Sequence, residues 1–424
     1  MKKPFKKIIL PNGMRVILVP NQKSLATTAL VLVEAGSKYE SKTINGLSHF
    51  LEHMCFKGTS KRSQFGKIAE ELDGLGADYN AFTGQEWTGY YAKVQKEHGR
   101  KALEIISDLF LNPIFNENEI EKERGVIIEE INMYEDLPMR NVQDIFMELL
   151  YGDQPAGWNI AGKKEIIKKL KKNDFIKYRN EHYVAKATVL IVAGAFNERQ
   201  VMQDIKEHFK EANIGKKAPK IRTIEKQTKP NVQLKYKKSD QTHLVLGFRA
   251  FDAKDKRQYA LEMLSGILGS GMSSRLFKRI RDELGAAYYV RSGVDLYTDH
   301  GYIAVSAGVD HKKLKIVIQA ILEEFKRFKT QLVGDVELKR AKDYVSGKTI
   351  LGLESTDALA MFFGGQEIMH EPLKTPEETL QKMKKIKAED IKAVAQEIFK
   401  KNTMNLALIG PYKDKKEFEK ILTI

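Results

Sequence analysis

Two stretches of the chain repeat the same order of elements 216 positions apart, and this repeat constrains the fold more than any other feature. Residues 170–196 and residues 386–412 each read as a helix with an acidic residue near its start, followed by an apolar strand that ends at glycine. The matched positions pair Asp174 with Asp390, Tyr183 with Phe399, and Gly194 with Gly410. Identical residues are few, but similarity at one spacing without a gap indicates duplicated structure.

A looser correspondence relates residues 72–84 to residues 281–293, each of which follows an amphipathic helix and opens a strand. The strands predicted at residues 28–33 and 242–246 also match. Strand-rich runs alternate with long helical patterns, which favours an α+β or mixed-sheet α/β fold. The sequence therefore predicts two duplicated domains, each a mixed β-sheet packed with helices.

The segment between the two copies has the composition of a linker. Residues 215–230 are polar, rich in lysine and interrupted by proline. We therefore predict a first domain of residues 1–218 and a homologous second domain of residues 219–424. A chain of 424 residues is long enough for each domain to bury its own core.

The N-terminus is basic like a signal peptide, but its apolar stretch of residues 8–10 is too short for export. The break at Pro11, Asn12 and Gly13 predicts two strands around a turn instead. No apolar run approaches the roughly 18 residues of a membrane span. The single cysteine, Cys55, excludes an intrachain disulfide. We expect a soluble, cytoplasmic protein without a membrane partner.

The formal charge of +15 raises the question of nucleic-acid binding. The lysines are spread along the chain, and the densest run, residues 163–172, reads as a solvated helix face. No motif combines basic residues with interleaved aromatic residues. We therefore expect no nucleic-acid partner.

His49, Glu52 and His53 form the strongest chemical signal in the sequence. Residues four apart lie on one face of a helix, so the two histidines can bind one zinc ion. Glu52 lies on the adjacent edge, where it can act as a general base without being a ligand. Histidines at this spacing are more often ordinary core or surface residues. Apolar neighbours indicate a buried helix, however, and there these polar groups need partners.

A third ligand is expected from the acid-rich helix predicted over residues 116–136, whose apolar residues recur with period 3.6. Glu130 flanks the apolar stripe, whereas Glu129 lies on the opposite, solvated face. A carboxylate at an apolar border is costly unless it is paired or metal-bound, so geometry favours Glu130 as the ligand. Glu123, two turns earlier on the same side, can support the ligands from behind. The alternative is a charged amphipathic surface helix.

The order His49, Glu52 and His53, followed by Glu130 after 76 intervening residues, resembles the signature of the pitrilysin/insulinase zinc peptidases, or inverzincins. In that family the last glutamate of the second motif ligates zinc, and the glutamate seven residues earlier assists catalysis, which implies Glu130 and Glu123. The resemblance covers nearly the whole chain and includes residues 76–94, 151–167 and 266–290. The length is similar to that of short bacterial members resembling mitochondrial processing peptidase subunits.

The resemblance implies that each chain is half of a clamshell, and that two chains enclose a chamber in which peptides are cut. It also implies that peptides bind as an added strand along an edge formed by Asn80, Ala81 and Phe82. Strand addition recognises the peptide backbone through main-chain hydrogen bonds, which suits peptides of mixed sequence. The alternative for this segment is an ordinary buried strand.

The second half has no zinc motif, because the residues opposite the three motif positions are Glu262, Ser265 and Gly266. One zinc ion per chain is therefore expected. The loop of residues 269–272 resembles the family's glycine-rich substrate loop. By composition alone it is an ordinary loop between two helices. Arg291 and Tyr297 are candidates for the family's substrate-contacting arginine and tyrosine, and Arg291 reads equally well as a surface residue.

These observations together predict a zinc metalloendopeptidase that acts on peptides or unfolded segments. One alternative is a non-catalytic structural subunit of the same fold, which the complete motif argues against. A second alternative is an active subunit paired with an inactive, zinc-free homologue. The expected partners are peptide substrates and a second chain, in a homodimer or such a heterodimer.

Overall fold

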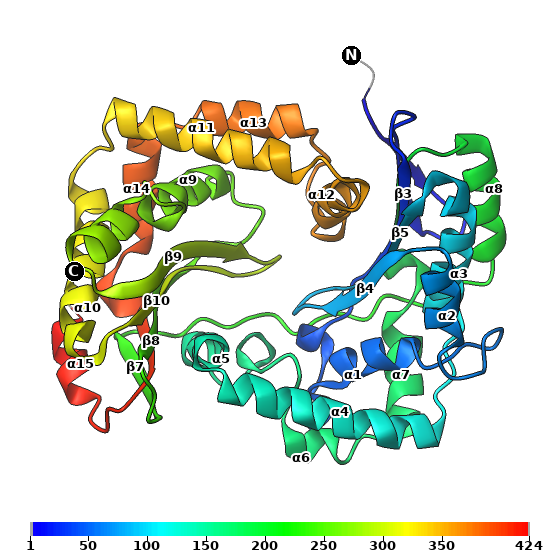
Figure 1. Ribbon diagram of the computed structural model, residues 1–424, viewed down its shortest axis with the longest axis horizontal. Coiled ribbons are helices and arrows are strands. Elements are labelled where there is room, and N and C mark those ends of the chain that lie inside the picture. Colours follow the sequence, from blue (N-terminus) through cyan, green and yellow to red (C-terminus); the bar gives the residue numbers. More distant parts are fainter. Residues whose placement is uncertain (1–2, 423–424) are drawn as a thin grey trace. The chain divides into compact units, whose positions relative to one another are not determined.

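The computed structural model describes residues 3–422, which form two compact units, each built around one β-sheet (Figure 1). The first unit contains the residues up to Asn132, with Trp158–Ile221 and Leu351–Thr375. The second contains Met133–Gly157, Arg222–Ile350 and the residues from Pro376 onward. The boundary predicted between residues 218 and 219 lies close to Ile221, where the chain passes from the first unit to the second. In addition, one segment from each half of the chain belongs to the other unit.

The first unit holds a six-stranded mixed sheet, as the alternating pattern of the sequence predicts. In spatial order its strands are β1 (Lys6–Ile9), β2 (Arg15–Pro20), β6 (Thr188–Gly194), β3 (Ala26–Val33), β5 (Thr88–Gln95) and β4 (Asp78–Thr83). Only β2 and β6 are parallel. The two strands predicted around the Pro11–Gly13 turn are confirmed as β1 and β2. Strand β4 pairs with β5 alone and is therefore an edge strand.

In residues 3–422, the second unit repeats this sheet without a counterpart of β1. Its strands are, in order, β7 (Asn231–Tyr236), β11 (Met404–Gly410), β8 (Thr242–Ala250), β10 (Gly301–Val309) and β9 (Ala287–Leu296), and again only the first pair is parallel. Helix α7 (Lys172–His182) before β6 matches helix α14 (Ala388–Ile398) before β11 residue for residue. Asp174 and Asp390 accept the same capping hydrogen bond in the two helices. The predicted duplication is confirmed.

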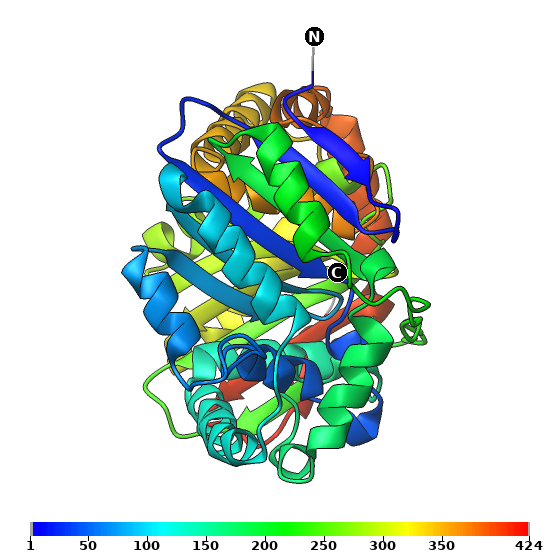
Figure 2. The same ribbon diagram turned by 90° about the vertical axis from the view of Figure 1, so that its right-hand side faces the viewer.

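Both faces of the first sheet are apolar, because successive side chains of a strand point to opposite faces. Helices α3 (Gly99–Leu111) and α8 (Glu198–His208) lie side by side over one face (Figure 2) and share a core with Val31. Helix α12 (Thr356–Ile368) covers the other face, where Phe363 packs in the cluster that contains Leu30, Leu32 and Ile191 (Figure 1). A helix from the second half of the chain thus completes the first unit.

The second unit is completed in the same way by a helix from the first half of the chain. Helix α5 (Pro138–Tyr151) packs on β8 and β11, with Phe146 against Val245 and Ala407. The remaining helices are α1 (Leu47–Cys55), α2 (Lys67–Gly74), α4 (Glu117–Asp136), α6 (Lys164–Ile167), α9 (Gln258–Gly269), α10 (Leu314–Thr330), α11 (Asp335–Gly352), α13 (Pro376–Lys384) and α15 (Lys416–Ile421). Within residues 3–422, no helix is long and apolar enough to cross a membrane.

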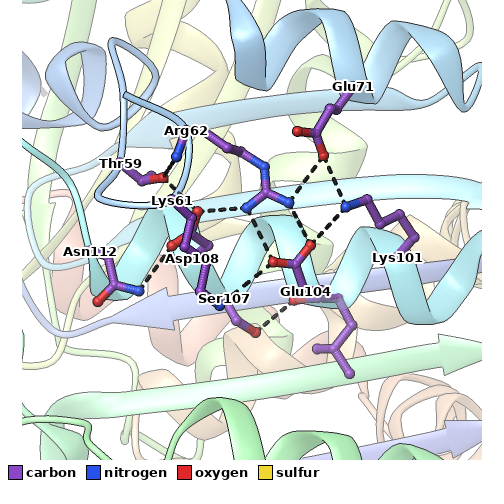
Figure 3. Close-up of polar contacts among 10 residues, drawn as sticks. Thr59, Lys61, Arg62, Glu71, Lys101, Glu104, Ser107, Asp108 and Asn112 are labelled. Carbon is purple, nitrogen blue, oxygen red and sulfur yellow. Dashed lines mark hydrogen bonds and ion pairs between the residues drawn. The ribbon is translucent and has the colours of Figure 1, made fainter. Parts of the chain in front are cut away.

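A buried arginine anchors the segment that follows helix α1 (Figure 3). The guanidinium of Arg62 donates to Asp108 at 2.6 Å and to Glu104 at 2.5 Å, and both carboxylates lie on helix α3. Glu71 accepts a further hydrogen bond from Arg62, and Lys101 pairs with both Glu71 and Glu104. The second unit repeats the arrangement after helix α9, where Arg275 pairs with Glu324 and Glu337.

Candidate metal centre

Helix α1 presents two histidines on one face, one turn apart. The apolar side of the helix, including Phe50, Leu51 and Met54, is fully buried in the core of the first unit. That packing leaves the rings of His49 and His53 partly exposed, with centroids 4.7 Å apart. The spacing that the sequence shows therefore produces a pair of imidazole groups held rigidly by a buried helix.

Helix α4 brings Glu130 to this pair. Oε2 of Glu130 lies 3.6 Å from Nε2 of His49 and 3.6 Å from Nε2 of His53. Glu129 is exposed on the other side of the helix, in agreement with the predicted solvated face. The sequence argument that separated these neighbouring glutamates thus agrees with their positions.

These three side chains fit a zinc ion. Tetrahedral zinc with ligand bonds of about 2.0–2.1 Å places its ligand atoms roughly 3.4 Å apart. The observed separations of 3.6 Å match that spacing and are too long for direct hydrogen bonds. Two imidazole nitrogens and one carboxylate oxygen are also a ligand set that zinc accepts, with a fourth position left for water or substrate.

Glu123 lies behind His53, as the helical spacing predicts. Its Oε1 is 2.8 Å from Nδ1 of His53, and its Oε2 is 2.5 Å from Nζ of Lys57. A carboxylate at Nδ1 favours the tautomer that carries its proton there and leaves the lone pair of Nε2 for a metal. Burial tends to raise the pKa of Glu123, but the hydrogen bonds from His53 and Lys57 lower it overall, so the group is an anion.

The pKa values of the two histidines shift in opposite directions because their surroundings differ. Burial lowers the pKa of His49 to about 4, helped by the nearby charge of His53. His49 is therefore neutral near pH 7, as a ligand must be. Burial also disfavours the charged form of His53, but the hydrogen bond to Glu123 and the charges of Glu52 and Glu130 raise its pKa overall.

Glu52 is held by a residue that the sequence argument missed. The hydroxyl of Thr83, the last residue of β4, donates a hydrogen bond of 2.5 Å to Oε2 of Glu52. Burial raises the pKa of Glu52, and the hydrogen bond from Thr83 offsets part of this rise. Lys57, which pairs with Glu123, was also missed, and helical spacing does not place it because it lies beyond the end of helix α1. No local spacing links Thr83 to Glu52, because they lie on different elements.

The predicted substrate residues Asn80, Ala81 and Phe82 lie on edge strand β4, next to α1. Asn80 is exposed, Ala81 is buried, and Phe82 is half-buried against Trp87 at a centroid distance of 5.3 Å. Gly89 on β5 leaves room for the Phe82 ring, because a Cβ there would lie 2.2 Å from it. Among the described strands, none pairs with the other side of β4, which strand addition requires to be free.

The second unit offers no comparable centre. Within its described residues alone, no three metal-ligating side chains approach a common point. Ser265 on helix α9 instead shares a hydrogen bond of 2.7 Å with Ser292 of β9. Arg291 is an exposed residue of β9, and the Tyr297 ring stacks on His300 at 4.4 Å. In the loop of residues 269–272, Gly269 approaches the backbone of Ser292 too closely to admit a side chain.

Comparison with known proteins gives the class to which this fold and site correspond. The profile described as Insulinase (Peptidase family M16) matches residues 15–164, and the profile described as Peptidase M16 inactive domain matches residues 169–345. Together they cover more than half of the chain. The chain belongs to peptidase family M16.

Individual relatives agree with this assignment over the full length. The chain is 34% identical to a Bacillus subtilis strain 168 protein named uncharacterized zinc protease YmxG, covering 96% of this chain and 98% of that one. It is 35% identical to an uncharacterized zinc protease of Rickettsia felis, covering 97% and 98%. A protease from Helicobacter pylori has a similar structure, with a TM-score of 0.89, 26% identity, and coverage of 96% and 99%.

Proposed function

We propose that the protein is a zinc-dependent endopeptidase whose centre comprises His49, His53 and Glu130 as ligands and Glu52 as acid–base group. The observation that carries this proposal is the position of Oε2 of Glu130, 3.6 Å from Nε2 of both histidines. Relatives named zinc proteases support the choice of metal. The proposal includes one zinc ion per chain, because the described residues of the first unit contain, by themselves, one group of three candidate ligands.

A zinc ion bound by these ligands would supply a Lewis acid that polarises a peptide carbonyl and lowers the pKa of a water molecule. The side chains around the metal would transfer the proton and orient the ligands. Glu52 takes the proton of the attacking water and returns it to the leaving amine. Its raised pKa, caused mainly by burial, makes the carboxylate a better base than an exposed glutamate. Glu123 keeps the His53 ring oriented throughout.

The substrate in this proposal is an extended peptide that adds a strand to the free side of β4. Its main chain would pair with the backbone of Asn80, Ala81 and Phe82, which gives affinity with little dependence on side chains. Thr83 ends this strand and bonds Glu52, so the binding edge and the acid–base group are adjacent. Flexible peptides and unfolded segments can present such a strand, whereas a folded domain cannot.

We further propose that two chains associate around the substrate, as a homodimer or with a zinc-free homologue. The other candidate function, a non-catalytic subunit of the same fold, is disfavoured because the three ligands, Glu52 and Glu123 are all present and adjacent. Size measurement of the purified chain beside a peptidase assay separates these cases. A monomer or homodimer with activity would exclude the need for a heterologous partner.

The decisive experiment compares wild-type protein with Glu52→Gln, both loaded with zinc. The variant should keep the metal and the fold but lose hydrolysis of an unstructured peptide by about 10²–10⁴-fold, because it has no group to move the proton. A chelator should abolish the wild-type activity, and added zinc should restore it. Near-normal turnover by zinc-loaded Glu52→Gln would contradict the proposed mechanism.

A further inference from the structure

The start of helix α1 is capped by a carboxylate from outside the helix. Glu40 is completely buried, with 0% of its surface exposed. Its Oε1 accepts the backbone N–H of Ser48 at 2.6 Å, and its Oε2 accepts the backbone N–H of Gly46 at 2.8 Å. The side-chain amide of Asn45 adds a third hydrogen bond at 3.0 Å.

These bonds replace a cap that the helix cannot make itself. The first N–H groups of a helix have no partners within it. The cap position of α1 is Gly46, which has no side chain to accept them. The negative charge of Glu40 also interacts favourably with the partial positive charge of a helix N-terminus. The position of the first turn of α1 therefore depends on Glu40.

The backbone that carries Glu40 is itself fixed to the turn after edge strand β4. Ser37 and Lys38 donate their N–H groups to the carbonyl oxygens of Gly84 and Gln85, at 3.2 Å and 2.8 Å. Gly36 lies so close to this turn that a Cβ would come within 2.4 Å of the Gly84 oxygen. Glu40 thus connects the end of β4 to the beginning of the helix that bears the candidate ligands.

His49 is the ligand that depends most on this connection. It follows Ser48 directly, and its Nδ1 is buried without a hydrogen-bond partner among the described residues. The His53 ring is oriented by Glu123, but no side chain bonds Nδ1 of His49 in the same way. The His49 ring is therefore positioned by the backbone of α1 and by packing.

Burial of the Glu40 carboxyl group carries an energetic cost. Burial raises its pKa to about 7, although the hydrogen bonds from Ser48, Gly46 and Asn45 oppose the rise. A carboxyl group whose pKa is raised on folding stabilises the fold at low pH and loses that contribution as the pH rises through the folded-state value. Ionised Glu40 is thus a cost to folding, whereas a serine or asparagine cap would supply the hydrogen bonds without a buried charge.

We propose that Glu40 is a positioning residue for the metal centre, and that its carboxyl group holds the first turn of α1 so that His49 reaches the same point as His53 and Glu130. The inference rests on the proposed zinc site. The groups that face this carboxylate are Asn45, Ser48 of α1 and Tyr178 of α7, whose hydroxyl lies 2.8 Å from that of Ser48.

The test measures the zinc affinity of metal-free protein at pH 8 by competition with a chromogenic chelator, for wild type, Glu40→Gln and Glu324→Gln. Glutamine resembles the protonated carboxyl group and cannot accept all three bonds. We expect Glu40→Gln to bind zinc about 10–100-fold more weakly, the loss typical of a residue that orients ligands. Glu324→Gln, which removes another buried carboxylate that contacts no candidate ligand, should leave the zinc affinity close to that of the wild type.

Two further readouts separate positioning from general loss of stability. Thermal melts of the metal-free proteins report stability, and the visible spectrum of the cobalt-substituted proteins reports ligand geometry. We expect an altered cobalt spectrum in Glu40→Gln but not in Glu324→Gln, even where their melting temperatures fall equally. Glu40→Asp, whose shorter side chain cannot reach both N–H groups, replaces Glu40→Gln if the latter does not fold.

The outcomes are distinguishable from failure of the proposed function. Wild type that binds no zinc would overturn the proposed function itself. Wild-type zinc binding with an unchanged affinity and cobalt spectrum in folded Glu40→Gln would overturn only the role of Glu40. If Glu324→Gln weakened zinc binding as much as Glu40→Gln, the role of Glu40 would be structural and the proposal would be rejected. The same conclusion would follow if neither Glu40→Gln nor Glu40→Asp folded.

Discussion

The Thr83 hydroxyl donates a hydrogen bond of 2.5 Å to the Glu52 carboxylate, which joins the last residue of an edge strand to a buried helix. Thr83 and Glu52 are 31 positions apart in the chain. The bond leaves the other oxygen of Glu52 available for a proton. It also fixes the carboxylate relative to the strand where we propose that the peptide binds.

Removing this hydroxyl should impair the acid–base group without removing the metal. In Thr83→Val, we expect kcat/KM to fall roughly 10-fold or more, since hydrogen bonds to charged groups are worth about 1.5–3 kcal/mol. The bond lowers the pKa of Glu52, so its loss should move the acidic limb of the pH–rate profile to higher pH. Thr83→Ser keeps the hydroxyl and should retain most of the activity. An unshifted profile in Thr83→Val would contradict this role.

Zinc content should distinguish the neighbouring glutamates of helix α4. His49→Ala and Glu130→Gln each remove a proposed ligand and should lose bound zinc on dialysis, whereas Glu129→Gln should keep about one ion per chain because that side chain is exposed. Elemental analysis of the purified variants measures this directly. Full zinc occupancy in Glu130→Gln, or its loss in Glu129→Gln, would show that the ligand is misassigned.

Glu123 should affect the metal indirectly. In Glu123→Gln a neutral amide replaces the carboxylate that bonds Nδ1 of His53, and the ion pair with Lys57 is lost. We expect zinc to bind about 10–100-fold more weakly, but not to be abolished, as for other partners of histidine ligands. The measurement is the chelator competition described for Glu40. Zinc affinity equal to that of the wild type would exclude a supporting role for Glu123.

The buried ion pair in Figure 3 should contribute strongly to stability. Arg62→Met leaves Asp108 buried without its cationic partner, and breaking such a pair typically costs about 3–5 kcal/mol. Denaturant unfolding of the metal-free protein measures the loss. Arg100→Met removes an arginine whose ion pair with Asp204 is exposed, and it should change stability little. Equal effects of the two substitutions would show that burial is not the cause.

Cleavage should depend on the conformation of the substrate. If peptides pair with β4, a sequence offered as a free peptide should be cut, and the same sequence in a loop of a stable folded protein should survive. A proline that removes a backbone N–H needed for pairing should block cleavage locally. Mass spectrometry of the products of a proline scan tests both statements. Equal cutting of the free and folded forms would reject strand addition.

Much of the local structure followed from the sequence. The spacing of 216 positions predicted the matching helix and strand of the two units, now seen as α7 with β6 and α14 with β11. Helical periodicity separated Glu130 from Glu129, because the backbone geometry of a helix fixes which positions share a face. The same geometry placed His49 and His53 one turn apart. These predictions needed only short-range rules that hold for any helix or strand.

Other features were decided by tertiary structure. Both sheets are apolar on both faces, so each needs helices on two sides. Helix α12, from the second half of the chain, covers one face of the first sheet, and helix α5, from the first half, covers one face of the second sheet. The contacts of Thr83 with Glu52 and of Glu40 with Ser48 likewise join elements that no local spacing relates. The sequence determined which residue types face a core and which chemistry they can perform. Only long-range packing decided which elements meet, because burial of apolar surface does not depend on where along the chain the partner lies.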